Sequence, residues 1–266
     1  MTSSKQNNIF VCIACNYPAL PTDFVVSLFS MFDNFYGWCK EKKRDDHFSL
    51  IIHGGYNLDE MRNDVTDMAL ENGATHIAYF DTDVVSPPET LYWMMEDLEE
   101  NEDQGVEAIT GIYHWKTEPF HPYLYSQWSE EETAFNGIIT YPLDTLFQVA
   151  AAGAGCFMVK REVLERVKKP WFKWVKPGQM EELPKGIGED LFFFWKTKPL
   201  MLCDSRINCL HYQNKGIGLK TYLSVNGLEI KNNWITGNEE NMKKLLDKAN
   251  LKAQKGVEEW LKKKEV

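Results

Sequence analysis

The sequence predicts an α/β protein in which helices flank a mostly parallel β-sheet, with a small antiparallel region and a C-terminal helix. Over residues 9–111, short apolar runs alternate with segments of helical periodicity, which is the order expected of β-α-β units. Beyond residue 111 the pattern changes to short mixed runs broken by Pro and Gly, which favours antiparallel strands and loops. The 266 residues, 44% of them hydrophobic, are enough to bury such a core.

The elements of the parallel region are bounded by turn residues. Pro18 and Pro21 follow the first apolar run, and Gly54 and Gly55 follow the second. The expected strands are residues 9–15, 48–53, 74–80 and 106–111, and the expected helices are residues 23–35, 58–72 and 87–98.

The third of these helices has a clear start signal. Ser86 is a favourable N-cap, Pro87 suits the first helical position, and Glu89 can complete a capping box. We therefore expect this helix to begin at residue 87.

The second half of the chain mixes strands, loops and short helices. A glycine- and proline-rich loop at 176–188 precedes an aromatic helix, and a charged helix ends the chain. The expected order is antiparallel strands within 112–145, strands at 146–151 and 156–160, a helix at 162–167, a helix at 191–195, a strand at 207–210 and a helix at 239–264. We expect one domain over residues 1–235, with a nucleotide-binding half at 9–111 and an acceptor half at 112–235, followed by a helical tail at 236–266.

Net charge and cysteine content argue against several functional classes. The net charge of −10 argues against broad electrostatic binding to nucleic acid or anionic lipid, although a local basic groove is compatible with it. No apolar run approaches the roughly 20 residues needed to span a bilayer, and the first residues are polar, so we expect a cytoplasmic protein. Cys12 and Cys15 lie three apart on an expected strand and face opposite ways, so the six cysteines predict buried, reduced thiols rather than a zinc site or disulfides.

Two aspartates directly after an apolar run point to metal chemistry. Asp81 and Asp83 follow the strand at 74–80, and side chains two apart on a strand share a face. The carboxyl ends of strands are where open α/β sheets bind ligands. Paired carboxylates suit Mn²⁺ or Mg²⁺, which takes its other ligands from water and substrate phosphates. Aspartates also end strands and cap turns, so the pattern alone leaves both interpretations open.

Further candidates lie downstream. Glu189 and Asp190 follow a glycine-rich loop and open a helix, where acids either complement the helix dipole or serve as a base at the mouth of a cleft. His211 ends an apolar strand and is either a structural residue or a third metal ligand. Arg62 and Asn63 could contact a phosphate or a sugar hydroxyl, or form an ordinary exposed face.

Glycines and aromatics add weaker signals. Gly153 and Gly155 lack the spacing of a phosphate-binding loop, so they indicate either close backbone approach to a substrate or a tight bend. Aromatic rings stack well on the apolar faces of sugars, although most aromatics will be part of the core. The candidate sugar platforms are Tyr113, Trp115, Trp171 and Phe172.

Taken in order from residue 9 to 211, these segments resemble the GT-A glycosyltransferases, especially the family 2-like group, whose fold is Rossmann-like. Met61-Arg62-Asn63 is similar to the family's Ala-Arg-Asn element, with Met in place of the usual Ala. The other segments that carry the resemblance are Phe10–Cys15, Tyr79–Asp83, Ala152–Arg161, Gly188–Asp190 and Asn208–His211. The brevity of the chain and of its acceptor region is typical of stand-alone viral or prokaryotic transferases.

The resemblance implies a role for each matching position. Cys15 would border the nucleotide base, Asp81 and Asp83 would bind the metal and the diphosphate, and Gly155 would border the donor sugar and the acceptor. Asp190 would be the base of an inverting enzyme, supported by Glu189, and His211 would be a metal ligand. The combination of Glu189-Asp190 with His211 occurs in inverting and retaining members, so the stereochemistry stays open.

The sequence thus predicts a metal-dependent glycosyltransferase that moves a sugar from a nucleotide sugar, expected to be a UDP-sugar, to an acceptor hydroxyl. The acceptor could be a glycan, a lipid, a protein or a modified nucleic-acid base. Three alternatives are a metal-dependent nucleotidyltransferase, a phosphohydrolase and a non-catalytic sugar-binding module. A nucleotidyltransferase should carry a glycine-rich basic loop after its first strand, and residues 16–21 contain neither glycine nor a basic residue.

Overall fold

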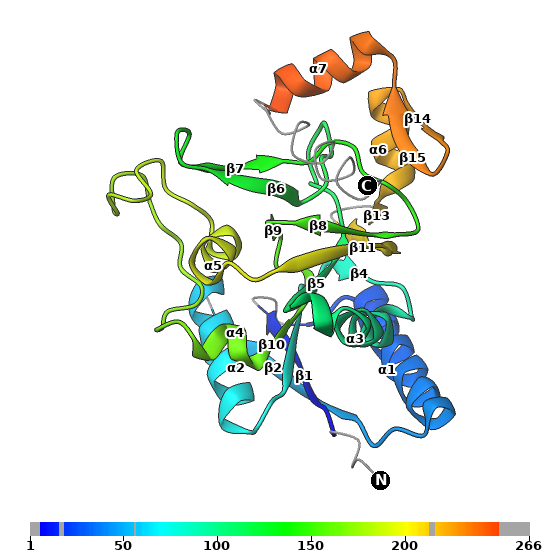
Figure 1. The fold of residues 1–266 in the computed structure, drawn as a ribbon, viewed down its shortest axis with the longest axis vertical. Helices are drawn as coiled ribbons and strands as arrows, with labels where there is room; N and C mark the ends of the chain where they lie inside the picture. Colours follow the sequence, from blue (N-terminus) through cyan, green and yellow to red (C-terminus); the bar gives the residue numbers. More distant parts are fainter. Residues whose placement is uncertain (1–5, 16–18, 56, 213–215, 250–266) are drawn as a thin grey trace.

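The computed structural model describes residues 6–15, 19–55, 57–212 and 216–249. A seven-stranded sheet forms its centre (Figure 1). Five of the strands, β2, β1, β3, β5 and β11, run in one direction and the other two run against them, so the predicted mostly parallel α/β fold is confirmed. In spatial order the strands are β2 (His47–Gly54), β1 (Asn8–Cys15), β3 (His76–Phe80), β10 (Cys156–Lys160), β5 (Ala108–Ile112), β11 (Met201–Asn208) and β8 (Leu146–Val149).

Helices cover both faces of the sheet because successive strand side chains point to opposite sides. On β1, Ile9 and Val11 pack with α1 (Thr22–Lys42) and α3 (Thr90–Glu100), whereas Phe10 and Cys12 pack with α2 (Leu58–Glu71). The second face also receives α4 (Arg161–Glu165) and α5 (Glu189–Thr197). Figure 1 shows α1 and α3 on one side of β1 and β2, with α2 and α4 on the other.

The start of α3 differs from the prediction. The helix begins at Thr90, and no side-chain cap bond is made at its N-terminus. The Ser86 side chain instead contacts the thiols of Cys156 and Cys209, while its backbone exchanges hydrogen bonds with the Ser27 hydroxyl. The capping box at Ser86 is therefore wrong, because tertiary contacts occupy the residue that local sequence nominates as the cap.

Small antiparallel sheets accompany the central sheet, as expected. The hairpin of β6 (Leu124–Ser129) and β7 (Ala134–Gly137) pairs with β9 (Ala151–Ala152). The strand β12 (Leu210–Tyr212) lies between β4 (Val84–Val85) and β13 (Gly216–Ile217). The remaining elements are a 3₁₀ turn at Glu102–Gln104, α6 (Leu219–Asn226), the hairpin β14 (Leu228–Lys231) and β15 (Trp234–Gly237), and α7 (Glu239–Ala249).

Several helix and strand boundaries differ from the predicted ones. The first helix is longer than expected, and the predicted strand ending at His211 is two strands, β11 and β12, separated by Cys209. The tail helix is present from Glu239 to Ala249, where Leu245 packs into the main core, and the rest of the predicted helix lies outside the described residues. All six cysteines are buried thiols, as predicted. None of the described helices combines the length and hydropathy needed to cross a bilayer.

Candidate functional site

Asp81 and Asp83 lie in a turn just beyond β3, at the carboxyl edge of the parallel strands. The Asp81 N–H donates to the Gly155 carbonyl at 3.1 Å, and the Val84 N–H donates to the Asp81 carbonyl at 3.1 Å. Because the strand ends at Phe80, the expectation that both carboxylates share a strand face does not hold. Each carboxylate instead engages a different set of charged partners.

A buried guanidinium joins the first aspartate to the Glu189-Asp190 pair. Arg62 of α2 donates to Asp81 Oδ1 at 2.6 Å and to Glu189 Oε1, and only 3% of Arg62 is exposed. Desolvation alone would lower the pKa of Arg62, but the surrounding carboxylates outweigh it and the pKa is raised. Three segments far apart in sequence therefore meet around one charge.

Asp190 begins α5 next to this ion pair. Its Oδ1 accepts the backbone N–H of Leu191 at 2.7 Å. Desolvation and the neighbouring charge of Glu189 raise the pKa of Asp190 to about 7, against the opposing effect of Arg62. A carboxyl with this pKa can accept and release a proton near neutral pH, which is the property required of a general base.

Asp83 is held by Lys116 and His211. Lys116 Nζ contacts Asp83 Oδ2, and His211 Nε2 lies 3.5 Å from Asp83 Oδ1. Desolvation acts to raise the pKa of Asp83, but these two partners outweigh it and lower the pKa to about 2. Asp83 is therefore an ionised carboxylate across the whole physiological pH range.

The environment of His211 suits a metal ligand. Its Nδ1 lies 2.7 Å from the His114 carbonyl oxygen, which only accepts, so Nδ1 carries the proton. An Nε2–H on the doubly protonated ring lowers the pKa of Asp83, whereas in the neutral ring the Nε2 lone pair is free to bind a cation beside the Asp83 carboxylate. Metal-ligating histidines are commonly oriented by such a bond from the second ring nitrogen to a carbonyl. Asp83 and His211 thus fit one nitrogen and one carboxylate ligand of a divalent cation.

The described residues do not form a complete metal cage. Among them, no three His, Cys, Asp or Glu side chains come together as a metal-binding group. Asp81 is turned to Arg62, and Lys116 supplies positive charge beside Asp83. Two protein ligands fit a cation such as Mn²⁺ or Mg²⁺ that completes its coordination with water and substrate phosphates.

Close packing against Tyr113 explains the two glycines. A Cβ at Gly153 would lie 2.0 Å from the Tyr113 hydroxyl, and one at Gly155 would lie 2.9 Å from Tyr113 Cζ. The Gly155 N–H also donates to Tyr113 Oη at 3.0 Å. The backbone approach that the glycines permit is thus to a protein ring, and a role for Gly155 beside the donor sugar stays a prediction.

Other predicted residues have structural partners. The Asn63 amide is bonded to the backbones of Asp59, Trp171 and Phe172, which anchors the 171–172 segment on α2. Cys15 is buried at the end of β1. Trp171 and Phe172 are also buried, which leaves Trp115, 37% exposed, as the accessible member of the proposed sugar platforms. The ligand-binding roles of Cys15, Arg62 and Asn63 stay predictions.

Lys116 is the residue that the sequence analysis missed. It lies four positions after Ile112, the end of β5, and β5 is parallel to β3. A signal was therefore present, since residues that follow parallel strands gather at one edge of a sheet. The pattern did not say which of the polar residues after β5 would reach Asp83.

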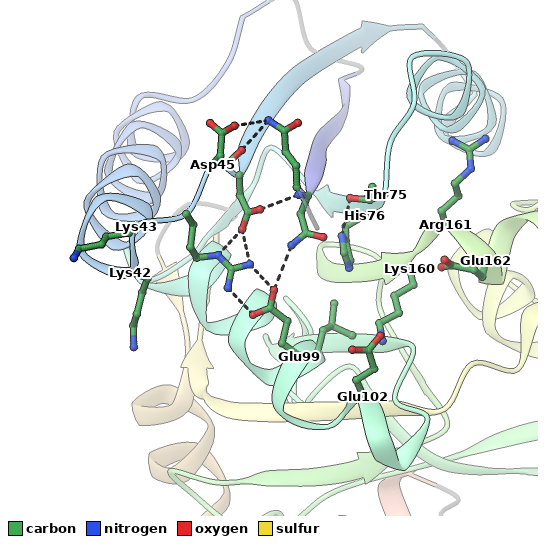
Figure 2. A pocket seen from close by; sticks show the side chains of 15 residues that line it. Lys42, Lys43, Asp45, Thr75, His76, Glu99, Glu102, Lys160, Arg161 and Glu162 are labelled. Carbon is green, nitrogen blue, oxygen red and sulfur yellow. Dashed lines mark hydrogen bonds and ion pairs between the residues drawn. The ribbon is translucent and has the colours of Figure 1, made fainter. Parts of the chain in front are cut away.

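A second polar region lies at the opposite edge of the sheet. A cavity of about 500 Å³ is lined by residues from the ends of α1 and α3 and the starts of β1 and β3 (Figure 2). Three of its charged groups pair with one another: Arg44 bonds to Asp46 and Glu99, and Asn7 bonds to both of these acids. This network joins the segment before the first strand to the ends of α1 and α3, and it is separate from the Asp81 turn.

Comparisons with known proteins identify structures with a similar fold but no related sequence family. No family model matches the sequence, and no curated protein matches it. Among solved structures, the chain is similar to A197 from STIV, with 21% identity over 80% of this chain and 90% of that chain and a TM-score of 0.53. Weaker similarities include the catalytic domain of Drosophila beta1,4galactosyltransferase 7 in complex with xylobiose (11% identity, 80% and 67% coverage, TM-score 0.37) and UDP-glucose pyrophosphorylase complexed with UDP-glucose (11%, 83% and 97%, TM-score 0.38). The chain therefore shares the fold of A197.

Proposed function

We propose that this chain is a metal-dependent glycosyltransferase that moves a sugar from a nucleotide sugar, most simply a UDP-sugar, to an acceptor hydroxyl. The observation that carries the proposal is the cluster of Asp81, Glu189 and Asp190 around Arg62, beside the Asp83–His211 pair. It combines a proton acceptor tuned to neutral pH with a pair of cation ligands at the carboxyl edge of the sheet.

The residues divide into two groups by role. Asp83 and His211 would hold Mn²⁺ or Mg²⁺, which neutralises charge on the departing diphosphate. Asp190 accepts the proton of the attacking hydroxyl in an inverting reaction, or orients the donor sugar in a retaining one. Glu189 and Arg62 keep the Asp190 turn next to the Asp81 turn, so that donor and base are aligned.

The loop at 176–188 would close over the donor. Val175 and Ile187 exchange backbone hydrogen bonds at its base, and Val175, Leu183 and Phe192 form a small hydrophobic cluster separate from the two main ones. Because this cluster is separate from the two main ones, the loop can open from α5 without opening the main core.

Nucleotide binding tests the proposal most simply. A thermal-shift screen of nucleotide sugars, each with and without Mn²⁺, should find a donor that raises the melting temperature only when the metal is present. A ligand at a hundred times its Kd adds about 2.7 kcal/mol to the free energy of unfolding, which is a clear shift. Asp83→Asn should abolish that shift, whereas Asp33→Asn, an exposed aspartate on α1, should keep it.

Product analysis separates the transferase from its rivals. Metal-dependent release of nucleoside diphosphate and free sugar, in the absence of an acceptor, is the expected slow background reaction. Release of pyrophosphate from a nucleoside triphosphate would indicate a nucleotidyltransferase, and release of inorganic phosphate would indicate a phosphohydrolase. Nucleotide-sugar binding without any turnover would indicate a non-catalytic binding module.

A further inference from the structure

A line of aromatic rings begins at the candidate metal ligand. The His211 ring packs against buried Tyr113 with ring centroids 5.1 Å apart, and Tyr113 packs against Tyr123 at 5.0 Å. Tyr123 in turn lies 5.5 Å from Trp115. Tyr123 and Trp115 are partly exposed, so the line reaches the surface immediately beside the site.

The line continues along the β6–β7 hairpin. The Trp115 side chain lies beside the Tyr125 hydroxyl, and the Tyr125 ring lies 6.1 Å from Phe135. Phe135 packs edge-on against Trp128 at 5.1 Å, and Trp128 lies 6.4 Å from Trp195 on α5. We call the partly exposed members the aromatic track: Tyr123, Trp115, Tyr125, Phe135, Trp128 and Trp195.

The aromatic track ends in a pocket. A cavity of about 320 Å³ lies among β6, β8 and the end of α5, with Trp128, Trp195 and Phe135 among its walls. The amide side chains of Gln127 and Gln148 also line it. The residues that line it run from Ser126 to Pro199, and Figure 1 shows α5 and β8 below the β6–β7 hairpin.

The same helix links this pocket to the proposed base. Asp190 is in the first turn of α5, and Trp195 follows five residues later, about 7.5 Å along the helix axis. After desolvation, the charge of Asp190 is the next largest influence that raises the pKa of both Tyr123 and Tyr125. Asp190 and the pocket residue Trp195 are thus placed by the same short helix.

The lining chemistry matches a carbohydrate. Sugar rings present apolar C–H faces that stack on aromatic side chains, and their hydroxyls pair with amides, which both donate and accept. The Trp128 indole N–H is buried and has no hydrogen-bond partner among the described residues, which is unfavourable unless a ligand supplies an acceptor. A purely apolar lining would favour an alkyl chain, and a basic one would favour nucleic acid, but Lys198 and Glu130 balance each other here.

We propose that the aromatic track and its pocket form an acceptor subsite for an oligosaccharide, with the reacting sugar at Asp190 and the next units stacked toward Trp128 and Trp195. This rests on the proposed function, because it assigns the acceptor of that reaction. A glycan that spans the track would be held by stacking at several rings, whereas a monosaccharide would use only one. Longer oligosaccharides should therefore bind more tightly than their monomers.

The test measures binding without donor or metal, so that it does not depend on turnover. The 266-residue chain is screened on a glycan microarray, and the best oligosaccharide is then titrated by calorimetry against three variants. Trp128→Ala should weaken binding by about tenfold or more. Trp174→Ala removes a tryptophan that is 61% exposed and outside the track, and it should leave binding unchanged.

A second variant covers the case in which Trp128→Ala does not fold. Gln148 is exposed on the edge strand β8, so Gln148→Ala should leave the melting temperature unchanged and still weaken binding severalfold. Equal binding by Gln148→Ala, Trp174→Ala and the unmodified chain would overturn the proposal.

The outcomes distinguish this inference from the function on which it rests. Metal-dependent nucleotide-sugar binding without any array glycan binding would overturn the acceptor subsite and leave the transferase intact. Glycan binding lost in Trp128→Ala, without nucleotide binding, would leave a glycan-binding surface but would overturn the transferase and, with it, the role of the aromatic track as an acceptor subsite. Binding only of single-stranded DNA, or only of alkyl chains, would also overturn the assignment.

Discussion

Asp190 has a pKa raised to about 7 by desolvation and by Glu189, with Arg62 opposing. The base form is the carboxylate, so activity limited by Asp190 should rise with pH through about 7 and then level off. We predict this rise in kcat/KM, which reports groups in the free enzyme. Asp190→Asn should lower transfer by about 10²–10⁴-fold, because the amide cannot accept the proton.

The pH profile between 5.5 and 8.5, measured with a fixed acceptor, checks this prediction. Asp103→Asn, at an exposed position in the 3₁₀ turn, is the matched control and should follow the unmodified chain. A flat profile, or transfer by Asp190→Asn at the normal rate, would remove Asp190 from the role of base.

Lys116 competes with any cation at Asp83. The Lys116 ammonium contacts Oδ2 of the Asp83 carboxylate, and His211 lies next to Oδ1 of the same carboxylate. Lys116→Met should therefore bind Mn²⁺ more tightly in the absence of nucleotide, because the competing charge is gone. Electron paramagnetic resonance titration of free Mn²⁺ measures this, and Lys185→Met serves as control because Lys185 bonds to a backbone carbonyl elsewhere. Unchanged Mn²⁺ binding by Lys116→Met would place the metal away from Asp83.

At the level of elements, β5 and β10 are held together near the site by Tyr113 and the two glycines beside it. Gly153→Ala should destabilise the protein by about 1–3 kcal/mol, because its Cβ would lie 2.0 Å from the Tyr113 hydroxyl. Tyr113→Phe in the same chain should recover part of the loss. Urea denaturation measures both, and Gly37→Ala is the opposite control: beyond the adjacent helix backbone, an added Cβ would have no atom within 4 Å, so this helical position should gain stability.

If Gly153→Ala unfolds at the same urea concentration as the unmodified chain, the packing explanation for this glycine is wrong. A stable Gly153→Ala with impaired donor binding would instead favour the substrate-contact interpretation that the sequence left open.

The elements show which features sequence patterns determine. Strands β1, β3 and β10 are short apolar runs buried on both faces, and helix α2 has clear amphipathic spacing, so local pattern located them well. The predicted start of α3 was wrong because Ser86 makes hydrogen bonds with Ser27, Cys156 and Cys209, which come from distant segments of the chain. No local signal marks the two-residue strand β4, whose pairing separates His211 from β11.

In the candidate site, too, local sequence predicted some features and tertiary contacts determined others. Strand-end position and motif order predicted that Asp81 and Glu189-Asp190 belong to one site, and the buried Arg62 bridge places Asp81 and Glu189 together. The partners of each carboxylate could not be predicted, because Lys116 and Arg62 reach them across 33 and 19 residues of chain. Sequence locates the acids, whereas tertiary packing decides which cation each one faces.

At the scale of the whole molecule, a buried acid pair couples stability to pH. Asp97 of α3 and Asp204 of β11 are both buried, and Arg206 Nη2 lies 2.8 Å from each carboxylate. Desolvation and the charge of Asp204 raise the pKa of Asp97 from 3.8 to about 8, against Arg206. The native state therefore holds a proton that the unfolded chain releases near pH 4.

The sign of the effect follows from proton linkage. Between about pH 4 and pH 8 the native state binds more protons than the unfolded chain, so stability should fall as pH rises, by up to about 1.4 kcal/mol per pH unit from this site. Asp97→Asn should lessen that slope, and Asp45→Asn, at an exposed position, should not. Urea unfolding at several pH values measures the slope. Identical slopes for Asp97→Asn and the unmodified chain would contradict the assignment.

The location of the cation is the point on which the proposed function depends. Crystals grown with UDP and Mn²⁺, measured at the manganese absorption edge, report that location directly. The account predicts one strong anomalous peak in contact with Asp83 and His211, with the diphosphate on its other side. A peak bound elsewhere, or well-ordered UDP with no manganese at the turn after β3, would contradict it.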